Sequence, residues 1–453
     1  MEDLRRLAGD CVHCGFCLPA CPTYQLWGDE MDSPRGRIHL MTQVMDGAML
    51  DGPVLAHLDR CLGCMACVPA CPSGVQYDRL IEAARAWPLD EPRSAAQRAA
   101  RAAIFAVIPY PRRLRLLGGP MRAAQRAGLD RLLARSAAHG IAARLPATAA
   151  AALRLAPPPT RRIRLPERVP ARAPSGGRGP RSRAQRRERR AVVGLLTGCV
   201  QAEFFPQVNA ATARLLAAEG CDVIIPRGQG CCGALSLHSG RAGEAATLAR
   251  RLVNVFDRAG VDAVVVNAAG CGSAMKEYGE LVVGEAGNPA GAEDAADRES
   301  PATRLARKVR DLTEFLAELG PVAERHPLEL TVAYHDACHL AHAQGVRAQP
   351  RALLRAIPGL KLVEIQDGGT CCGSAGVYNL LQPEPARELG ERKADAVMAA
   401  KVAGADLLVS GNPGCSLQIT AALADRAERI PVAHTAEVID ASIRGLPVSA
   451  LTS

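Results

Sequence analysis

Hydrophobic residues after position 190 gather in short aliphatic runs that alternate with longer segments of helical periodicity. Strands of this kind, separated by helices, are typical of βαβ units and parallel sheets. The runs are 191–197, 223–225, 263–266, 330–333, 360–365 and 407–409. We therefore expect an α/β architecture for this half of the chain.

The chain before position 156 has a helical pattern instead. Ser33 and Pro34 form a typical helix start, since serine caps a first turn and proline fits the first helical position. Apolar residues follow at helical intervals at Ile38, Leu40, Met41, Val44 and Met45. Residues 79–155 are predicted to be helical too, and the apolar stretch 102–108 is too short to span a bilayer.

Residues 157–190 differ from both halves. They contain seven prolines, twelve arginines and two acids, a net charge of +10 against +9 for the whole chain. This composition predicts a linker, and the rest of the chain is close to neutral. A solvated, disordered linker is the simplest interpretation, contact with anionic lipid or an acidic partner is the second, and nucleic-acid binding is disfavoured because no aromatic residues are interleaved.

The amino-acid composition limits what the core is made of and which cellular compartment suits the protein. Apolar residues make up 48% of the chain but aromatic residues only 3%, so the core must be built from small aliphatic side chains. The N-terminus is acidic and lacks the apolar segment of a secretory signal. Seventeen cysteines in such a chain indicate metal binding or catalysis in a reducing compartment rather than disulfides, and their spacing must decide between the two. We expect a cytoplasmic protein, with peripheral contact to the inner face of the cell membrane as the alternative.

Eight cysteines form two copies of the motif C-x2-C-x2-C-x3-C followed by proline. This is the spacing of two-cluster bacterial ferredoxins, in which the fourth cysteine of each copy ligates the other cluster. We therefore assign Cys11, Cys14, Cys17 and Cys71 to one 4Fe-4S cluster, and Cys61, Cys64, Cys67 and Cys21 to a second. Zinc is disfavoured because it prefers two C-x2-C pairs a loop apart. The 39 residues between Cys21 and Cys61 have room for a helix, which indicates a helical variety of ferredoxin.

A second cysteine pattern occurs twice in the C-terminal half, which indicates an internal duplication. The two sets are Cys199, Cys231, Cys232 and Cys271, and Cys338, Cys371, Cys372 and Cys415. Glycine follows each adjacent pair, and every member comes just after a predicted strand. Because open α/β sheets assemble their sites at the carboxyl ends of strands, four thiols in each copy can converge on a metal site.

Several other residues near these cysteines have two interpretations. Cys221 lies outside the pattern and is predicted to be a small buried apolar residue. The polar side chains beside Cys338 and after Cys271 could donate hydrogen bonds to the thiols or carry protons. They could equally well cap a helix or belong to an ordinary turn. They are His335, Asp336 and His339, and Lys276, Glu277 and Tyr278.

With both cysteine arrays in place, the chain resembles the glycolate oxidase iron–sulfur subunit family over nearly its full length. The residues that carry the resemblance are 11–17 (CVHCGFC), 21–25 (CPTYQ), 28–30 (GDE), 34–37 (PRGR), 57–61 (HLDRC), 71–74 (CPSG), 209–214 (NAATAR), 270–272 (GCG), 276–279 (KEYG) and 371–376 (CCGSAG). The resemblance implies a membrane-associated complex that oxidises glycolate to glyoxylate. It also implies FAD on a partner subunit, a second flavoprotein-like subunit and a quinone-type acceptor.

The C-terminal repeats are also similar to the cysteine-rich CCG domains of heterodisulfide reductase, anaerobic glycerol-3-phosphate dehydrogenase and lactate-utilisation proteins. In those families the repeat typically ends in C-x2-C, whereas this chain has Ala274 and Gln418 at the last position. Four thiols per repeat leave three outcomes open: a cluster, a zinc ion, or no stable metal.

These features predict an iron–sulfur electron-transfer subunit of a glycolate dehydrogenase complex, an oxidoreductase acting on CH–OH donors. The chain alone is not expected to oxidise glycolate, and we assign it no catalytic residue. It has no strand-linked G-x-G-x-x-G for a flavin of its own, since its clustered glycines lie in the linker. The alternatives are a subunit of a D-lactate or glycerol-3-phosphate dehydrogenase, a CCG-domain disulfide or quinone reductase, and a CCG half that serves only for docking.

The predicted fold class is α+β overall, with an all-α helical ferredoxin module followed by duplicated α/β CCG domains. The expected boundaries are 1–90 for the ferredoxin domain, 91–156 for a helical connector, 157–190 for the linker, 191–325 for the first CCG domain and 326–453 for the second.

Overall fold

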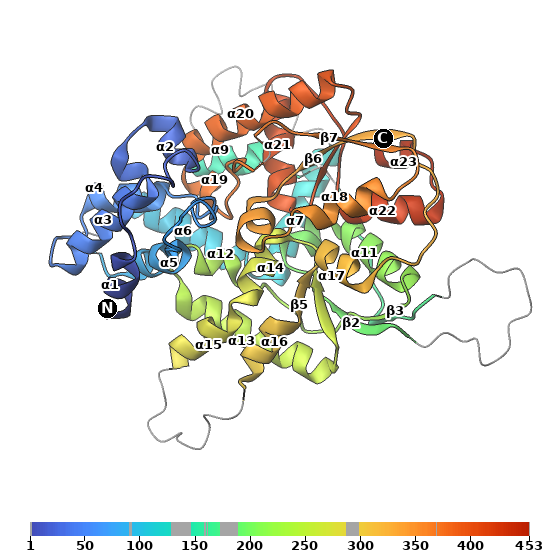
Figure 1. The fold of residues 1–453 in the computed structure, drawn as a ribbon, viewed down its shortest axis with the longest axis horizontal. Helices are drawn as coiled ribbons and strands as arrows, with labels where there is room; N and C mark the ends of the chain where they lie inside the picture. Colours follow the sequence, from blue (N-terminus) through green and yellow to red (C-terminus); the bar gives the residue numbers. More distant parts are fainter. Residues whose placement is uncertain are drawn as a thin grey trace, which may run out of the picture.

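The computed structural model describes residues 2–89, 93–127, 146–157, 160, 162–172, 189–286, 299–367 and 369–452. A helical module at the N-terminus lies against two α/β units that follow each other along the chain (Figure 1). We call residues 2–89 the ferredoxin module, 189–325 the first repeat and 326–452 the second repeat. The predicted fold class is confirmed, since the duplicated half is built on parallel sheets.

The ferredoxin module is a cluster of short helices joined by two cysteine loops. Its elements are α1 (Glu2–Gly9), α2 (Pro22–Trp27), η1 (Glu30–Asp32), α3 (Pro34–Met45), α4 (Gly52–Arg60) and α5 (Tyr77–Ala86). The predicted start of α3 is confirmed, because the Ser33 hydroxyl accepts a hydrogen bond from the Gly36 amide at 3.0 Å and Pro34 is the first helical residue. Leu58 and Ile81 are fully buried in the small core of this module.

Three helices of the connector lie along the repeats. They are α6 (Ala95–Val107), α7 (Pro111–Arg126) and α9 (Ala147–Arg154). The apolar stretch 102–108 belongs mostly to α6, where Ile104 and Phe105 are buried. Tyr110 donates a hydrogen bond to Glu244 at 2.8 Å, and Arg154 pairs with Asp425 at 2.7 Å, so the connector contacts both repeats. Within the described ranges, no helix is long and apolar enough to cross a membrane.

Each repeat is built on one sheet, and four strands have the same order in both; the first sheet has β1, from before the repeat, as an additional edge strand. The strands of the first are β1 (Arg168–Val169), β2 (Ala191–Leu195), β3 (Cys221–Ile224), β4 (Ala263–Val266) and β5 (Val309–Asp311), in the order β1-β3-β2-β4-β5. Those of the second are β6 (Leu330–His335), β7 (Leu360–Glu364), β8 (Leu407–Ser410) and β9 (Val432–Ala433), in the order β7-β6-β8-β9. Because β3, β2, β4 and β5 correspond in turn to β7, β6, β8 and β9, the topology agrees with an internal duplication.

The six predicted strands are present, and three short ones were missed. Strands β1, β5 and β9 have only two or three residues, too few to show a hydrophobic period. Strand β1 lies inside the predicted linker and pairs antiparallel with β3, so this part of 157–190 is an edge strand rather than a solvated tether. Residues 158–159, 161 and 173–188 of the linker lie outside the described residues.

Helices cover both faces of each sheet, and one set lies between the two sheets (Figure 1). In the first repeat they are α10 (Val200–Phe204), α11 (Pro206–Ala218), α12 (Ala234–Leu237), α13 (Ala242–Ala259), α14 (Ala269–Lys276), α15 (Tyr278–Ala286), α16 (Pro301–Lys308) and α17 (Leu312–Leu319). In the second they are the single π-helical turn η5 (His339–Ala343), α18 (Ala348–Arg355), α19 (Tyr378–Leu381), α20 (Pro383–Val402), α21 (Pro413–Asp425), α22 (Thr435–Arg444) and α23 (Ser449–Thr452).

The two repeats share one hydrophobic core. Leu215 and Leu216 of α11 and Val438 and Ile439 of α22 are all fully buried in it. Above this core Arg214 makes a bidentate ion pair with Asp440, at 2.6 Å for the shorter contact. The repeats therefore form one packed body and hold their cysteine sites at a fixed separation.

Candidate functional site

The two cysteine loops of the ferredoxin module have matching backbone conformations. Counted from the first cysteine of each loop, the residues two and four positions later have positive φ: His13 and Gly15 in one loop, and Gly63 and Met65 in the other. A positive φ costs energy for non-glycine residues. Its presence at equivalent places indicates that both loops have the same tightly curved backbone conformation. This pseudo-twofold arrangement suits two cubic clusters.

The first four predicted ligands come together around one cavity. Cys11, Cys14, Cys17 and Cys71 all line it, together with Cys67. The other four lie close enough to affect one another's ionisation. Burial, followed by the charges of Cys64, Cys61 and Cys21, raises the pKa of the Cys67 thiol well above its ordinary value. All seventeen cysteines are free of disulfides, so these donor sets remain open to iron.

A buried arginine supports the second set of thiols. Arg37 is fully buried, its Nη1 lies 4.0 Å from the Cys21 Sγ, and its Nε donates to the His57 carbonyl at 2.7 Å. Burial opposes ionisation of Cys61, but Arg37 and Arg85 outweigh it and lower the pKa of that thiol. A cationic environment of this kind stabilises the thiolate form that binds iron.

Two further donors reach Cys61. The Gly63 amide lies 3.3 Å and the Tyr77 hydroxyl 3.6 Å from its Sγ. The sequence alone predicted no role for Arg37 or Tyr77. Arg37 was visible only as the last residue of the PRGR segment, where its burial could not be read.

Asp32 holds the arginine in place. It is 1% exposed and contacts Arg37 at 3.2 Å, Arg60 at 3.0 Å and the His57 ring at 3.0 Å. Asp29, Asp32 and His57 also lie close enough together to suggest a cation site. Because Asp32 is already neutralised by two guanidinium groups, we interpret this group as structural.

The four cysteines of the first repeat converge at the carboxyl ends of β2, β3 and β4. Cys199 Sγ lies 3.6 Å from Cys231 Sγ, and the Gly233 amide donates to Cys231 Sγ at 3.4 Å. The hydrogen bond to Cys231 and burial raise the pKa of Cys199 well above its ordinary value. The pKa values of Cys231 and Cys232 are raised too, so these three thiols favour the protonated form.

The glycine after each cysteine pair has a steric reason. Gly233 and Gly373 both have a φ of +87°. A Cβ on Gly233 would meet the Ala245 carbonyl oxygen at 3.0 Å, and one on Gly373 would clash with that of Ala386. The backbone of the next helix passes too close for any side chain, so both C-C-G turns require glycine.

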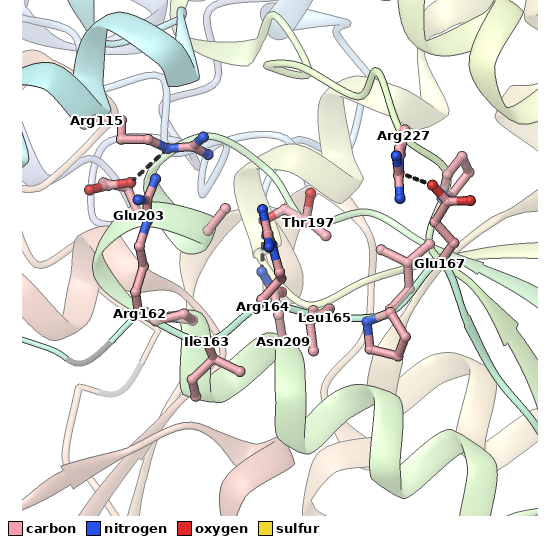
Figure 2. A pocket seen from close by; sticks show the side chains of 15 residues that line it. Arg115, Arg162, Ile163, Arg164, Leu165, Glu167, Thr197, Glu203, Asn209 and Arg227 are labelled. Atoms are coloured by element: carbon pink, nitrogen blue, oxygen red, sulfur yellow. Dashed lines mark hydrogen bonds and ion pairs between the residues drawn. The ribbon is translucent and has the colours of Figure 1, made fainter.

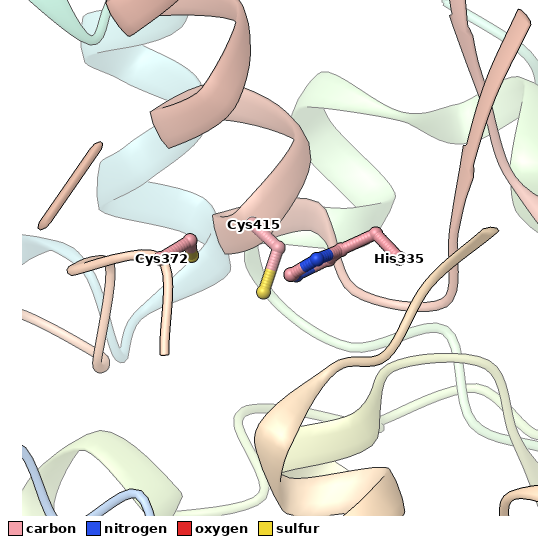
Figure 3. Close-up of side chains that lie close together, drawn as sticks. All are labelled: His335, Cys372 and Cys415. Atoms are coloured by element: carbon pink, nitrogen blue, oxygen red, sulfur yellow. The ribbon is translucent and has the colours of Figure 1, made fainter. Parts of the chain in front are cut away.

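The second repeat brings its four cysteines together in the same way but adds polar neighbours. The Nδ1 of His339 lies 3.5 Å from the Sγ of Cys338, and the side chain of Asn412 donates a hydrogen bond to the Sγ of Cys415 at 3.4 Å. His335 faces Cys372 and Cys415, and the three ligand atoms lie within 4.8 Å of one another (Figure 3).

These neighbours change the thiol chemistry. The Cys371 thiol and then His339 lower the pKa of Cys338 well below its ordinary value, despite burial. The Cys371 and Cys415 thiols, followed by His335, do the same for Cys372. Hydrogen bonds to neighbouring thiols and burial instead raise the pKa of Cys371 and Cys415, so the second repeat pairs two thiols that favour the thiolate with two that favour the protonated form.

The second site lies directly against the ferredoxin module. Residues of the second ferredoxin loop and of the second repeat form one buried cluster that includes Leu62, Cys64, Ala66, Cys338, Cys371 and Tyr378. The charge of Cys338 also raises the pKa of Cys64, after the larger effect of burial. The thiols of the first repeat instead pack with residues of their own repeat.

The remaining residues singled out from the sequence have identifiable contacts. Asp336 makes a bidentate pair with Arg351 at 2.9 and 2.7 Å, and Lys276 pairs with Glu314 at 2.7 Å. Tyr278 donates to the Cys232 carbonyl at 2.6 Å. Cys221 is fully buried at the start of β3, where burial raises its pKa to about 11, as suits a small apolar core residue.

A cavity of about 870 Å³ lies between the connector and the first repeat (Figure 2). Arg162 and Arg164 of the predicted linker line it, and Arg115 and Arg227 pair there with Glu203 and Glu167. No cysteine lines this cavity. It is therefore a surface separate from the metal sites.

Comparison with known proteins follows the same division of the chain. Residues 8–75 match a 4Fe-4S dicluster domain, residues 193–276 and 332–420 match a cysteine-rich domain, and residues 96–152 match the linker region of the glycolate oxidase iron–sulfur subunit. The "Probable glycolate oxidase iron-sulfur subunit" of Bacillus subtilis (strain 168) is 35% identical over 90% of this chain and 88% of its own. The chain belongs to the glycolate oxidase iron–sulfur subunit family.

Other relatives agree with this family. The "Glycolate oxidase iron-sulfur subunit" of Escherichia coli (strain K12) is 32% identical over 96% of this chain and 93% of its own. The "Lactate utilization protein A" of Oceanobacillus iheyensis is 30% identical over 56% of this chain and 98% of its own. The predicted family is therefore confirmed, and the chain is an iron–sulfur electron-transfer subunit of an oxidase complex.

Proposed function

We propose that this chain carries electrons within a glycolate dehydrogenase complex, from FAD on a partner subunit that oxidises glycolate to glyoxylate toward a quinone-type acceptor. The observation that carries the proposal is the packing of Cys64 with Cys338 and Cys371 in one buried cluster. It connects the ferredoxin module to the cysteine site of the second repeat through a buried contact. An electron-transfer subunit needs a buried path between its redox sites. A self-contained hydrolase or binding module does not.

The eight ferredoxin cysteines are the proposed cluster ligands. Cys11, Cys14, Cys17 and Cys71 would hold one 4Fe-4S cluster, and Cys61, Cys64, Cys67 and Cys21 the other. When bound, such clusters each take up and release one electron. The cavity lined by the first set and the matching positive-φ loops support this assignment.

The protein contributes charge and donors around these ligands. Arg37 and Arg85 place two guanidinium groups beside Cys61, and the Gly63 amide donates to the same sulfur. Cationic groups and hydrogen bonds to cluster sulfurs favour the more negative, reduced state, so they raise the reduction potential. Cys14 is exposed, whereas Cys64 is buried, so the two sets face different surroundings.

The proposed partners follow from the family. The relatives are named as subunits of glycolate oxidase, which supports a flavoprotein partner and a second, flavoprotein-like subunit beside this chain. We place the complex in the cytoplasm, with peripheral contact to the inner face of the membrane, where a quinone is accessible. The arginines of 157–190 are the proposed contact, and Arg162 and Arg164 are exposed.

A specific observation keeps a second candidate function in view. The match to lactate utilization protein A covers 56% of this chain. Because the oxidised acid would bind on the flavoprotein, D-lactate or glycerol 3-phosphate could replace glycolate without any change in this chain. Assay of the complex with each of the three donors discriminates between them.

The experiment that tests the proposal compares the lone chain with the complex. After anaerobic purification, the lone chain should contain at least the roughly eight irons of two cubes and show an EPR signal on reduction with dithionite. It should not oxidise glycolate. In the complex, glycolate should generate the same EPR signal; glycolate turnover by the lone chain, or clusters that glycolate cannot reduce in the complex, would refute the assignment.

A further inference from the structure

The second repeat aims one buried imidazole at its thiols. His335 is the last residue of β6, is 1% exposed, and points toward the sulfur of Cys415 (Figure 3). Its ring nitrogens and the sulfurs of Cys372 and Cys415 offer three ligand atoms within 4.8 Å of one another. Imidazole nitrogen and thiolate sulfur are the donors that zinc and iron accept in proteins.

Apart from the Cys372 thiol that it faces, the ring of His335 has no hydrogen-bond partner among the described residues. A buried polar group without a partner costs free energy, so most such groups in folded proteins are satisfied. His434 provides the comparison within the same repeat: its Nε2 lies 2.9 Å from the Asn267 carbonyl, and its Nδ1 accepts from the Ala436 amide at 3.0 Å. His434 thus uses both nitrogens in hydrogen bonds to the backbone, whereas His335 faces only thiols.

The first repeat has no equivalent group. Three residues before its first cysteine stands Leu196, where the second repeat has His335. At the position of Asn412, which donates to Cys415 Sγ, the first repeat has Ala268. The two cysteine sets are therefore alike, but the polar surroundings belong to the second repeat.

A second amide side chain close to Cys415 in the sequence is engaged elsewhere. Gln418, three residues after Cys415, donates from Nε2 to the Ala386 carbonyl at 2.7 Å and accepts from Asn379 at 3.2 Å. It joins α19, α20 and α21, so it is not free to turn toward a metal. His335 is therefore a nitrogen donor beside Cys372 and Cys415 that the backbone does not engage.

We propose that His335 is a metal ligand and that, with Cys372 and Cys415, it forms a nitrogen-and-sulfur metal centre in the second repeat. The metal is iron or zinc, which share this ligand chemistry. Cys338 and Cys371, in the same buried site, supply further sulfur donors. The first repeat, with Leu196 in this place, does not form the same centre.

The test uses the full chain, purified anaerobically after growth with 15N-histidine. If the centre holds iron, pulsed EPR of the reduced protein should show 15N coupling from a directly bound imidazole, and iron should exceed the content of the two cubes. If it holds zinc, X-ray absorption at the zinc edge should show nitrogen beside sulfur in the first coordination shell. A centre with sulfur ligands only, or no metal beyond the two cubes, overturns the proposal.

Three variants assign the nitrogen. His335→Gln should abolish the nitrogen signal, and His335→Cys should keep the metal with sulfur ligands only, which also shows that the fold tolerates change at this position. His339→Gln is the matched control, since His339 touches Cys338 but lies outside the group of three ligand atoms. Nitrogen that persists in His335→Cys, or disappears in His339→Gln, contradicts the assignment. The readouts are made on the chain alone, so they do not depend on which acid the complex oxidises.

Discussion

Cys64 of the ferredoxin module and Cys338 of the second repeat lie in one buried cluster, close enough for the charge of one to raise the pKa of the other. They are 274 positions apart in the chain as numbered. The thiols of the first repeat have no such contact and pack with their own repeat. The duplicated sites are thus unequal in position as well as in chemistry.

Replacing one cysteine in each repeat should have unequal effects. Cys372→Ser should lower acceptor reduction by the complex, by roughly 10- to 100-fold if the site behaves as other metal sites that lose a supporting group. Cys232→Ser, at the equivalent position of the first repeat, is the matched control and should lower it much less. The measurement is quinone reduction with glycolate as donor, together with the EPR signal of the ferredoxin clusters, which should be normal in both. Equal losses would show that the route does not distinguish the repeats.

Arg37→Gln should destabilise the ferredoxin module. The change leaves Asp32 and two thiols without their buried cation, and breaking a buried pair typically costs about 3–5 kcal/mol. Arg60→Gln removes a second partner of Asp32, but the Arg60 side chain is 40% exposed, so a loss below about 1 kcal/mol is expected. Thermal unfolding of the anaerobic protein and its iron content measure both effects. Comparable losses in the two variants would contradict a special role for Arg37.

Glu277 should make stability depend on pH. Burial, followed by Glu82 and Asp78, raises its pKa to about 8. Between its ordinary pKa of about 4.3 and that value the folded state holds a proton that the unfolded chain has lost, so stability falls as pH rises through this window.

Glu277→Gln should therefore be more stable than the parent at pH 8, by about 1–3 kcal/mol after allowance for partial solvation, and little different at pH 4.5. Glu280→Gln is the control, because Glu280 is exposed and pairs with Arg79. Urea unfolding at the two pH values measures the difference. A Glu277→Gln effect that does not change with pH would rule out the raised pKa.

Gly240→Ala should loosen the contact between the ferredoxin module and the first repeat. Gly240 has a φ of +75°, and a Cβ there would clash with the carbonyl oxygen and carbon of Arg85. Arg85 itself donates to the His238 carbonyl at 2.7 Å across the same contact.

The matched control is Gly260→Ala, at a φ of +58° with no atom near the added Cβ. That change should cost only the conformational strain of about 1–2 kcal/mol. Gly240→Ala should cost more and also increase protease cleavage between the module and the repeat. If the two variants unfold alike and resist protease alike, the close approach is not important for docking.

Several elements could be predicted because their signals are local. The start of α3 depends on Ser33 and Pro34, and the strands β2, β4, β6 and β8 on continuous aliphatic runs. Strands β1, β5 and β9 could not be predicted, because two or three residues carry no periodicity and form only against a neighbouring strand. The linker prediction failed at β1 for the same reason.

The sequence by itself determined the chemistry of the sites. Cysteine spacing within a few residues decides which thiols can wrap a cluster, and the repeated C-C-G turns mark where each sheet presents its thiols. The tertiary structure alone decided which groups meet across long separations: Arg37 beside Cys61, Cys64 beside Cys338, and His335 beside Cys372 and Cys415. The reason is that ligand spacing is a property of a few adjacent residues, whereas burial and proximity depend on how whole elements pack.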